Sequence, residues 1–312
     1  MIEAQALTKH FPVRGLFRSA SIRAVEDVSI AIPQGAALGL VGESGSGKST
    51  IGRLMLGLLR PTSGRVMIDG QDLAATGAAG VRRLRRRMQL VFQDPYSSLD
   101  PRRRVGAQVA DGLAIHGLPQ HGRVAELFDQ VGLPPDHARR FPHEFSGGQR
   151  QRIAIARALA TSPDLLVADE PVSALDVSVQ AQILALLADL RSRLGLALLF
   201  ISHDLPVVRS LCDRVAVLYL GRVMEEGPAA AIFRRPLHPY TQALLSAAPS
   251  LDPAARRTRI LLQGEPPSPS SPPSGCVFRT RCPIAIPACA EAVPPLHQHE
   301  PGHRAACIRI GT

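Results

Sequence analysis

A phosphate-binding loop between a strand pattern and a helix pattern constrains the fold of this 312-residue chain more than any other feature. The run from Ala37 to Val41 is short and apolar, as expected of a buried strand. The next eight residues, from Gly42 to Ser49, match G-x-x-x-x-G-K-[ST], and Ile51 to Leu59 has helical apolar spacing. The sequence therefore predicts an α/β protein with a nucleotide-binding core.

The chemistry of the loop follows from its residue types. Glycines let successive backbone N–H groups turn inward around phosphates, and the following helix start adds its positive dipole end. Lys48 is placed to reach the β- and γ-phosphates, and the Ser49 hydroxyl to ligate Mg²⁺. Only two of the 36 basic residues are Lys, so chance does not favour a Lys here. The alternative is a Gly/Ser-rich turn before a helix. The predicted nucleotide-binding residues of the loop are Gly42, Ser44, Gly45, Ser46, Gly47, Lys48, Ser49 and Thr50.

Two carboxylates end a second apolar run, from Asp164 to Glu170. A continuous apolar run suits a parallel strand that is covered on both faces. We expect Asp169 to hold the Mg²⁺ shell and Glu170 to accept a proton from the attacking water. Acidic pairs after strands also serve as helix caps, but the phosphate loop favours the catalytic interpretation.

Taken together, the motifs resemble the nucleotide-binding subunits of ATP-binding cassette (ABC) transporters. Six appear in the family's order: the phosphate loop, Gln93, Phe145 to Gln149, Asp169-Glu170, Ser173 to Asp176, and His203. The resemblance implies that Gln93 senses Mg²⁺ and the lytic water, that His203 holds the γ-phosphate, and that the loop of Asp176 lies across a subunit interface. By itself, His203 would be an ordinary loop residue after a strand.

Ser146, Gly147, Gly148 and Gln149, here called the signature, lead into a helix expected from about Gln149 to Ala160. A helix start of this kind is a second anion-binding end. In the family each ATP lies between the loop of one subunit and the signature of the other, so the resemblance implies a dimer. Phe145 replaces the commoner Leu, and Phe11 occupies the place of an adenine-stacking aromatic; an ordinary core Phe is the alternative.

The resemblance implies a P-loop NTPase cassette with a RecA-like core, an antiparallel β subdomain and a helical subdomain. We expect the cassette over residues 1–260, its helical subdomain at about 94–160, and a Cys-containing C-terminal extension over 261–312. Ile2 to Leu7 and Ile22 to Ile32 are strand-like, and residues 15–21 between them are expected to be a loop. No apolar run approaches the roughly 18 residues of a membrane span, and the amino terminus is not signal-like, so we expect a cytosolic chain.

Beyond the cassette, residues 263–275 form a Pro- and Ser-rich stretch typical of a stiff linker. Four of the five cysteines follow it: Cys276, Cys282, Cys289 and Cys307. Clustered thiols in a cytosolic protein favour metal binding over disulfides. Their spacing matches neither zinc knuckles nor the ferredoxin run, so the residues alone leave zinc and an iron–sulfur cluster open.

A narrower resemblance, to the ATPase subunits of dipeptide and oligopeptide importers, runs from Leu7 to Cys307. It rests on the phosphate loop, Gln93 to Arg102, Ala168 to Gln182, His238 to Leu245 and the Cys-containing tail, whose motif order is most similar to the dipeptide importer's second ATPase. It implies ATP and Mg²⁺ as cofactors and a [4Fe–4S] cluster at the four cysteines, with zinc as the alternative because His297, His299 and His303 are near.

The same resemblance implies the partners: a second ABC ATPase subunit, in a heterodimer more than a homodimer, two transmembrane permease subunits and an extracytoplasmic substrate-binding protein. The chain would then sit peripherally on the cytoplasmic face of the inner membrane. Rival functions are a soluble ABC ATPase acting on ribosomes or DNA, a redox sensor using the cysteine tail, and an importer of nickel or glutathione. One cassette without sustained heptads disfavours the first.

The net charge of +10 includes a basic cluster at residues 82–87 and another at 102–104. Such clusters occur on ordinary solvated faces, on surfaces facing anionic membranes and at nucleic-acid sites. With no Trp and three Tyr, the chain offers few stacking platforms for bases, so we expect no nucleic-acid partner.

Overall fold

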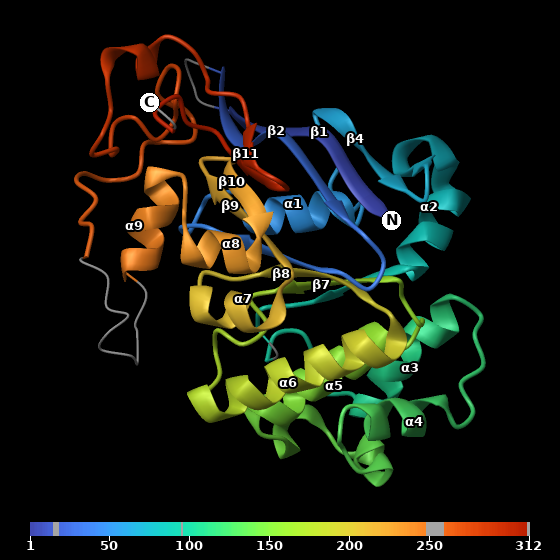
Figure 1. Cartoon of the computed structure of the whole chain (residues 1–312). Coiled ribbons are helices and arrows are strands. Elements are labelled where there is room, and N and C mark those ends of the chain that lie inside the picture. Colours follow the sequence, from blue (N-terminus) through green and yellow to red (C-terminus); the bar gives the residue numbers. More distant parts are fainter. Residues whose placement is uncertain (15–18, 95, 248–258, 311–312) are drawn as a thin grey trace. The chain divides into compact units, whose positions relative to one another are not determined.

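The computed structural model describes residues 1–14, 19–94, 96–247 and 259–310, which form two compact units, each discontinuous in sequence (Figure 1). Unit 1 consists of Met1–Ile2, Ile32–Ala37 and Ile68–Ile201. Unit 2 consists of Glu3–Ala31, Leu38–Met67 and Ser202–Thr312. The predicted phosphate loop lies in unit 2, and the predicted signature and acidic pair lie in unit 1.

Unit 1 is built on parallel strands. Strand β6 (Met88–Val91) pairs in parallel with β7 (Leu165–Asp169), and β7 pairs in parallel with β8 (Ala197–Ile201). The unit also contains the short strand β5 (Gln71–Asp72) and the helices α2 (Gly77–Arg86), α3 (Val105–Ile115), α4 (Arg123–Gln130), α5 (Gly147–Leu159) and α6 (Val177–Leu194). Short 3-10 helices are η1 (Leu73–Thr76), η2 (Pro135–Arg139) and η3 (Pro142–Glu144).

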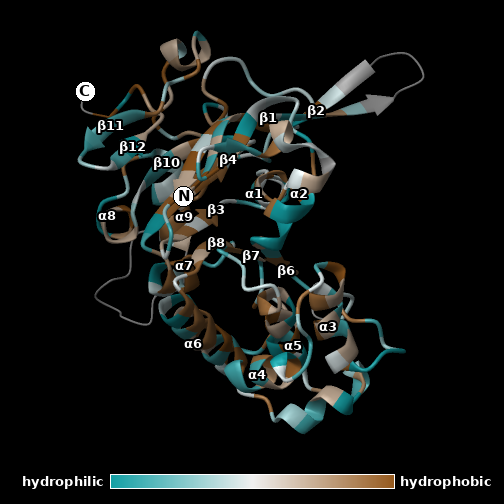
Figure 2. Cartoon of the chain, turned by 90° about the vertical axis from the view of Figure 1, so that its right-hand side faces the viewer, coloured by the Kyte–Doolittle hydropathy of each residue, from teal (hydrophilic) through white to brown (hydrophobic). Residues whose placement is uncertain are grey.

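The apolar pattern of the sequence explains these elements. All of β8 and all of β7 except Asp169 are buried, as expected of parallel strands with both faces covered. Helix α6 buries Ile183, Leu187 and Leu190, which share one face at helical spacing, and its ribbon alternates between brown and teal in Figure 2. Gly195, with φ of 63°, ends α6 in the left-handed conformation that glycine adopts readily.

Unit 2 contains two groups of strands. In the first, β2 (Ser19–Ile32), β1 (Ile2–Arg14) and β4 (Ser63–Ile68) are neighbours in that order. In the second the order is β11 (His297–Glu300), β12 (His303–Ala305), β10 (Arg222–Pro228), β9 (Arg214–Tyr219) and β3 (Ala37–Val41). Strands β3 and β9 are parallel, whereas β10 is antiparallel to both β9 and β12. The last strands of the chain therefore extend the sheet that carries the phosphate loop.

The helices of unit 2 are α1 (Lys48–Met55), α7 (Leu205–Leu211), α8 (Ala229–Arg234) and α9 (Pro239–Ala247), with the 3-10 helix η5 (Pro287–Ala290). The Pro-rich stretch contains neither helix nor strand among its described residues, as its composition predicts. It is held to β2 by a hydrogen bond from the Arg23 backbone N–H to the Pro269 carbonyl, 3.0 Å long.

Some predicted boundaries were wrong. Strands β1 and β2 are longer than expected, so residues 19–21 of the predicted loop belong to β2, while residues 15–18 lie outside the described ranges. Helix α1 begins at Lys48 and ends at Met55, because Gly57 turns the chain with φ of 62°. Across the described ranges, no helix is both long enough and apolar enough to cross a membrane.

Candidate functional site

The phosphate loop has a backbone that only glycine accommodates at its ends. Gly42 and Gly47 have φ of 152° and 101°, in the region that side chains disfavour. A methyl group at Gly42 would lie 2.2 Å from the Leu218 carbonyl oxygen, and one at Gly47 would lie 2.3 Å from that of Ala24. The loop therefore packs closely against the backbone of unit 2 on both sides.

Lys48 points back into this loop. Its Nζ atom donates to the carbonyl oxygens of Gly42 and Glu43 at 2.8 and 2.9 Å, and the residue is only 6% exposed. Ser49 and Thr50 occupy the first turn of α1 and are partly exposed, and Ser44 and Gly45 are exposed. The loop therefore brings together an ammonium group and the positive end of a helix, as phosphate binding requires.

The acidic pair stands at the end of β7. Asp169 is the last strand residue, and Glu170 adopts a positive φ of 48°, which costs a non-glycine residue roughly 1–3 kcal/mol. The Glu170 N–H donates to the Ile201 carbonyl at 2.9 Å, so the turn is anchored to β8. Gln93, which follows β6, donates from Nε2 to the Glu170 carboxylate at 3.1 Å. Two residues that are 77 positions apart are thus brought together at the carboxyl ends of parallel strands.

The loop before α6 is held by a residue that the sequence analysis missed. Asp176, the N-cap of α6, is exposed. Gln180 donates from Nε2 to the carbonyls of Val172 and Leu175 at 3.0 and 2.9 Å and so determines the path of this loop. The only signal in the sequence is a polar residue four positions after the N-cap.

The signature forms a capped helix start. Ser146 is the N-cap of α5; its Oγ accepts from the Gln149 N–H at 3.3 Å, while the Gln149 side chain accepts from the Ser146 N–H at 3.0 Å. Gly147 and Gly148 belong to the first turn, not to the segment before it as predicted. A methyl group at Gly148 would lie 2.5 Å from Val179 of α6, so the glycine permits close packing of α5 on α6.

His203 and Phe11 both lie in unit 2. His203 follows β8 and is exposed, and the flanking Ser202 and Asp204 hold its turn through a bond from the Asp204 N–H to Ser202 Oγ at 2.9 Å. Phe11 is half-buried on β1, with the Nζ of Lys9 5.1 Å from its ring centroid. That cation–π contact occupies one face of the ring.

The four cysteines of the tail are free thiols. Burial is the main cause that raises the pKa of the Cys276 thiol, and the nearby Cys289, Cys307 and Cys282 raise this pKa further. The four thiols therefore lie within electrostatic reach of one another. Within the described part of the chain, however, no group of three or more His, Cys, Asp or Glu side chains is arranged to hold a metal ion. The predicted iron–sulfur or zinc site is therefore not supported.

The three histidines that made zinc the alternative metal lie in different environments. His303 is buried, and its Nε2 lies 2.7 Å from the buried Glu225 carboxylate, so this nitrogen is engaged inside the protein. His297 and His299 are exposed on β11.

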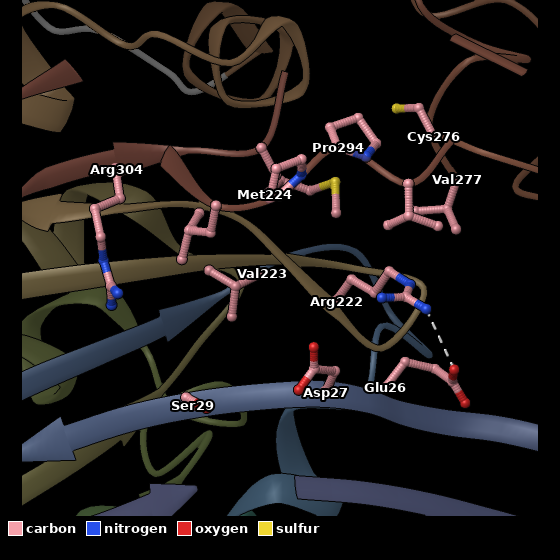
Figure 3. A pocket seen from close by; sticks show the side chains of 14 residues that line it. Glu26, Asp27, Ser29, Arg222, Val223, Met224, Cys276, Val277, Pro294 and Arg304 are labelled. Atoms are coloured by element: carbon pink, nitrogen blue, oxygen red, sulfur yellow. Dashed lines mark hydrogen bonds and ion pairs between the residues drawn. The ribbon is translucent and has the colours of Figure 1, made fainter. Parts of the chain in front are cut away.

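A hollow of about 430 Å³ lies in unit 2 beside Cys276 (Figure 3). Both arginines on its wall pair with carboxylates: Arg222 contacts Glu26 at 3.3 Å, and Arg304 contacts Glu226. The phosphate-loop residues do not line it. This hollow is thus separate from the candidate nucleotide site.

Comparison with known proteins identifies two regions of the chain. Residues 25–173 match the family described as ABC transporter, and residues 224–289 match the oligopeptide/dipeptide transporter C-terminal region. Over 99% of its length the chain is 56% identical to a Brucella ovis protein named for peptide import and ATP binding, of which it covers 98%. It is 48% identical to the oligopeptide transport ATP-binding protein AppF of Bacillus subtilis, with 98% of this chain and 96% of that protein covered.

Solved structures are similar as well. A dimeric ATP-binding cassette, MJ0796, in a post-hydrolysis state with ADP and Pi, is 31% identical, with a TM-score of 0.65 over 73% of this chain and 99% of that chain. The protein cbiO1 of Clostridium perfringens, part of the cbiONQ transporter complex, is 28% identical, with a TM-score of 0.66 over 75% of this chain and 90% of that chain. These matches confirm the resemblance to the ATPase subunits of peptide importers and the cassette fold predicted from the motifs.

Proposed function

Because this chain belongs to the ATP-binding subunits of ABC-type peptide importers, we propose a division of labour among its motif residues during ATP hydrolysis. We divide the chain into a cassette over residues 1–260, with the helical subdomain at about 94–160, and a C-terminal extension over 261–312. The observation that carries the proposal is the contact of Gln93 with Glu170 at the ends of two parallel strands.

The loop residues bind the triphosphate of ATP. Backbone N–H groups from Gly42 to Thr50 surround the phosphates, and Lys48, already aimed into the loop, binds the β- and γ-phosphates as a compact charge. Mg²⁺ would be held by the Ser49 hydroxyl, Gln93 and Asp169, whose oxygen atoms are the ligands that it prefers. The half-buried Phe11 is proposed to stack on adenine through the face not covered by Lys9.

Hydrolysis needs a base, and Glu170 is the proposed one. Its carboxylate accepts a hydrogen bond from Gln93, which orients it and connects it to the exposed segment after β6. Glu170 takes a proton from the attacking water, and His203 donates to the γ-phosphate. When Mg²⁺ is bound, it neutralises charge that develops on the phosphates.

The signature serves a second subunit. Ser146, Gly147, Gly148 and Gln149 present a capped helix start, which favours anions. We propose that this end completes the ATP site of another subunit, and that Asp176 lies at the same interface. The similar cassette MJ0796 has been solved as a dimer, which supports this arrangement.

Substitution of Glu170 by Gln tests the catalytic assignment. The variant should bind ATP with unchanged affinity but hydrolyse it at least roughly 100-fold more slowly, because only the proton acceptor is lost. With ATP bound and no turnover, it should accumulate as a dimer in size-exclusion chromatography. Glu291→Gln, on an exposed residue of the tail, is the matched control. Hydrolysis by Glu170→Gln at the control rate would remove Glu170 from this role.

The membrane partners are proposed to dock beside Gln93. Phe92 and Tyr96 next to it are 47% and 58% exposed, and Ile115 at the end of α3 is 57% exposed. A partner that covered these side chains would remove apolar surface from water, which stabilises association. Ile115 also lines a hollow with Arg82 and Arg86, which would face a partner or anionic headgroups.

We propose two permease subunits, a second ATPase subunit in a heterodimer and an extracytoplasmic binding protein as partners, with the chain on the cytoplasmic face of the inner membrane. Purification of the tagged chain from detergent-solubilised membranes tests this. Recovery of permeases and of a different ATPase subunit is the expected result. Recovery of ribosomes or DNA instead would favour the rival soluble ATPase.

The four cysteines of the tail take no part in the proposed hydrolysis. Four thiols are chemically suited to a [4Fe–4S] cluster or zinc, but their positions form no ligand group among the described residues. Iron and zinc analysis of anaerobically purified protein decides the matter: stoichiometric metal that is lost in a Cys276→Ser, Cys282→Ser variant would establish a site.

A further inference from the structure

The phosphate loop is tied to the C-terminal part of the chain through Glu43. The Glu43 carboxylate accepts a hydrogen bond from Arg281 Nη1 at 2.7 Å, and its backbone N–H donates to the Tyr240 hydroxyl at 2.9 Å. Its carbonyl accepts from Lys48 Nζ at 2.9 Å. Glu43 therefore contacts both the phosphate-binding lysine and two residues that lie 197 and 238 positions away along the chain. Glu43, Tyr240 and Arg281 are together called the loop clamp.

The two distal residues are rigidly held. The Tyr240 ring is fully buried and packs against Tyr219 and Phe278, with ring centroids 4.8 and 5.3 Å apart. The Arg281 side chain is only 8% exposed, and it also reaches the Tyr219 hydroxyl at 3.4 Å. Aromatic packing of this kind leaves these side chains few alternative rotamers.

The backbone around Arg281 is set by the cysteine segment. The Arg281 N–H donates to the Phe278 carbonyl at 3.0 Å, and the Cys276 N–H donates to the Cys289 carbonyl at 2.8 Å. Both Tyr240 and Arg281 lie in the region that matches the importer-specific C-terminal family. The clamp thus joins the region of residues 224–289, which matches the importer-specific family, to the phosphate loop.

We propose that Arg281 and Tyr240 are positioning residues for ATP binding, which set the conformation and the charge of the phosphate loop through Glu43. The carboxylate of Glu43 belongs to the loop that receives a triphosphate, and uncompensated it repels that ligand. Arg281 neutralises this charge, and Tyr240 holds the backbone at the same residue. The region of residues 224–289 therefore controls nucleotide affinity without contacting the nucleotide.

The test measures Mg²⁺-ATP binding to the full chain by calorimetric titration. Arg281→Gln should weaken binding roughly tenfold, because it leaves the Glu43 charge unpaired beside the phosphates. The double variant Glu43→Gln, Arg281→Gln should recover to within about threefold of the unsubstituted chain, because it has no unpaired charge. Arg279→Gln, two positions away on a side chain bonded to Ser274, is the matched control and should bind normally.

A purely structural role for Arg281 predicts no rescue, so equal weakness of the single and double variants would overturn the proposal. Normal binding by Arg281→Gln would overturn it too. If Arg281→Gln does not fold, Tyr240→Phe removes only the hydroxyl and should still weaken ATP binding severalfold; unchanged binding would refute the clamp. The inference rests on assigning the loop to ATP, and failure of that assignment would appear separately, as no binding by the unsubstituted chain.

Discussion

The free energy of unfolding of this protein should depend on pH through His238. This residue precedes α9 and is only 1% exposed; its Nδ1 accepts from the Tyr240 N–H at 3.1 Å. Burial lowers the pKa of His238 from 6.5 to about 4, although the nearby Glu225 carboxylate and a hydrogen bond with Ala306 act in the opposite direction. The histidine is therefore neutral in the folded protein at neutral pH.

The sign of the effect follows from proton counting. Between pH 6.5 and about 4 the unfolded chain carries a proton on His238 that the folded chain does not. The free energy of unfolding consequently falls as the pH falls through this window, by about 1.4 kcal/mol per pH unit and roughly 3 kcal/mol in total. Above pH 6.5 the contribution of His238 to stability is complete.

Urea unfolding of the wild type and of His238→Asn at several pH values measures this contribution. Asn keeps a cap acceptor for α9 but does not titrate, so the pH dependence of its unfolding free energy should be shallower below pH 6.5. His121→Asn, at an exposed position, is the control and should follow the wild type. Parallel curves for the wild type and His238→Asn between pH 6.5 and 4 would refute the reasoning.

Three further substitutions have definite expected outcomes. Glu225→Gln should lower the unfolding free energy by about 3 kcal/mol in urea titrations, because the buried carboxylate accepts hydrogen bonds from the backbone N–H groups of Leu237 and His238 and lies 2.7 Å from His303 Nε2; a loss under about 1 kcal/mol would contradict this. Gly148→Ala should reduce ATPase turnover by pushing α5 from α6, and adding Val179→Ala should restore it; failure of that rescue would exclude the steric cause. Gln180→Ala should slow turnover without weakening ATP binding, and a change in ATP affinity alone would show another role.

Much of the candidate site was predictable because it consists of short local motifs. Glycine positions with positive φ, a Ser and Gln at capping-box spacing, and apolar runs ending in carboxylates each specify their geometry within a few residues. Boundaries were less predictable. The helix after the phosphate loop starts at Lys48 because the loop backbone passes directly into the helix, which apolar spacing alone does not show.

For the cysteine segment, the sequence predicted a metal site that the structure does not support. Spacing and composition predicted a ligand group, but metal binding needs donor atoms that converge on one point, and the described part of the chain contains no such group of three or more. His303, counted as a possible ligand, is instead a partner of a buried carboxylate.

The sequence by itself determined the family and the motifs from which the site is proposed, since each motif consists of residues that are neighbours in the chain. Only the tertiary structure decided that Gln93 meets Glu170, that Gln180 holds the loop of Asp176, and that Arg281 reaches Glu43. The physical reason is that contacts across tens or hundreds of residues depend on strand order and packing, which leave no periodic trace in the amino-acid sequence.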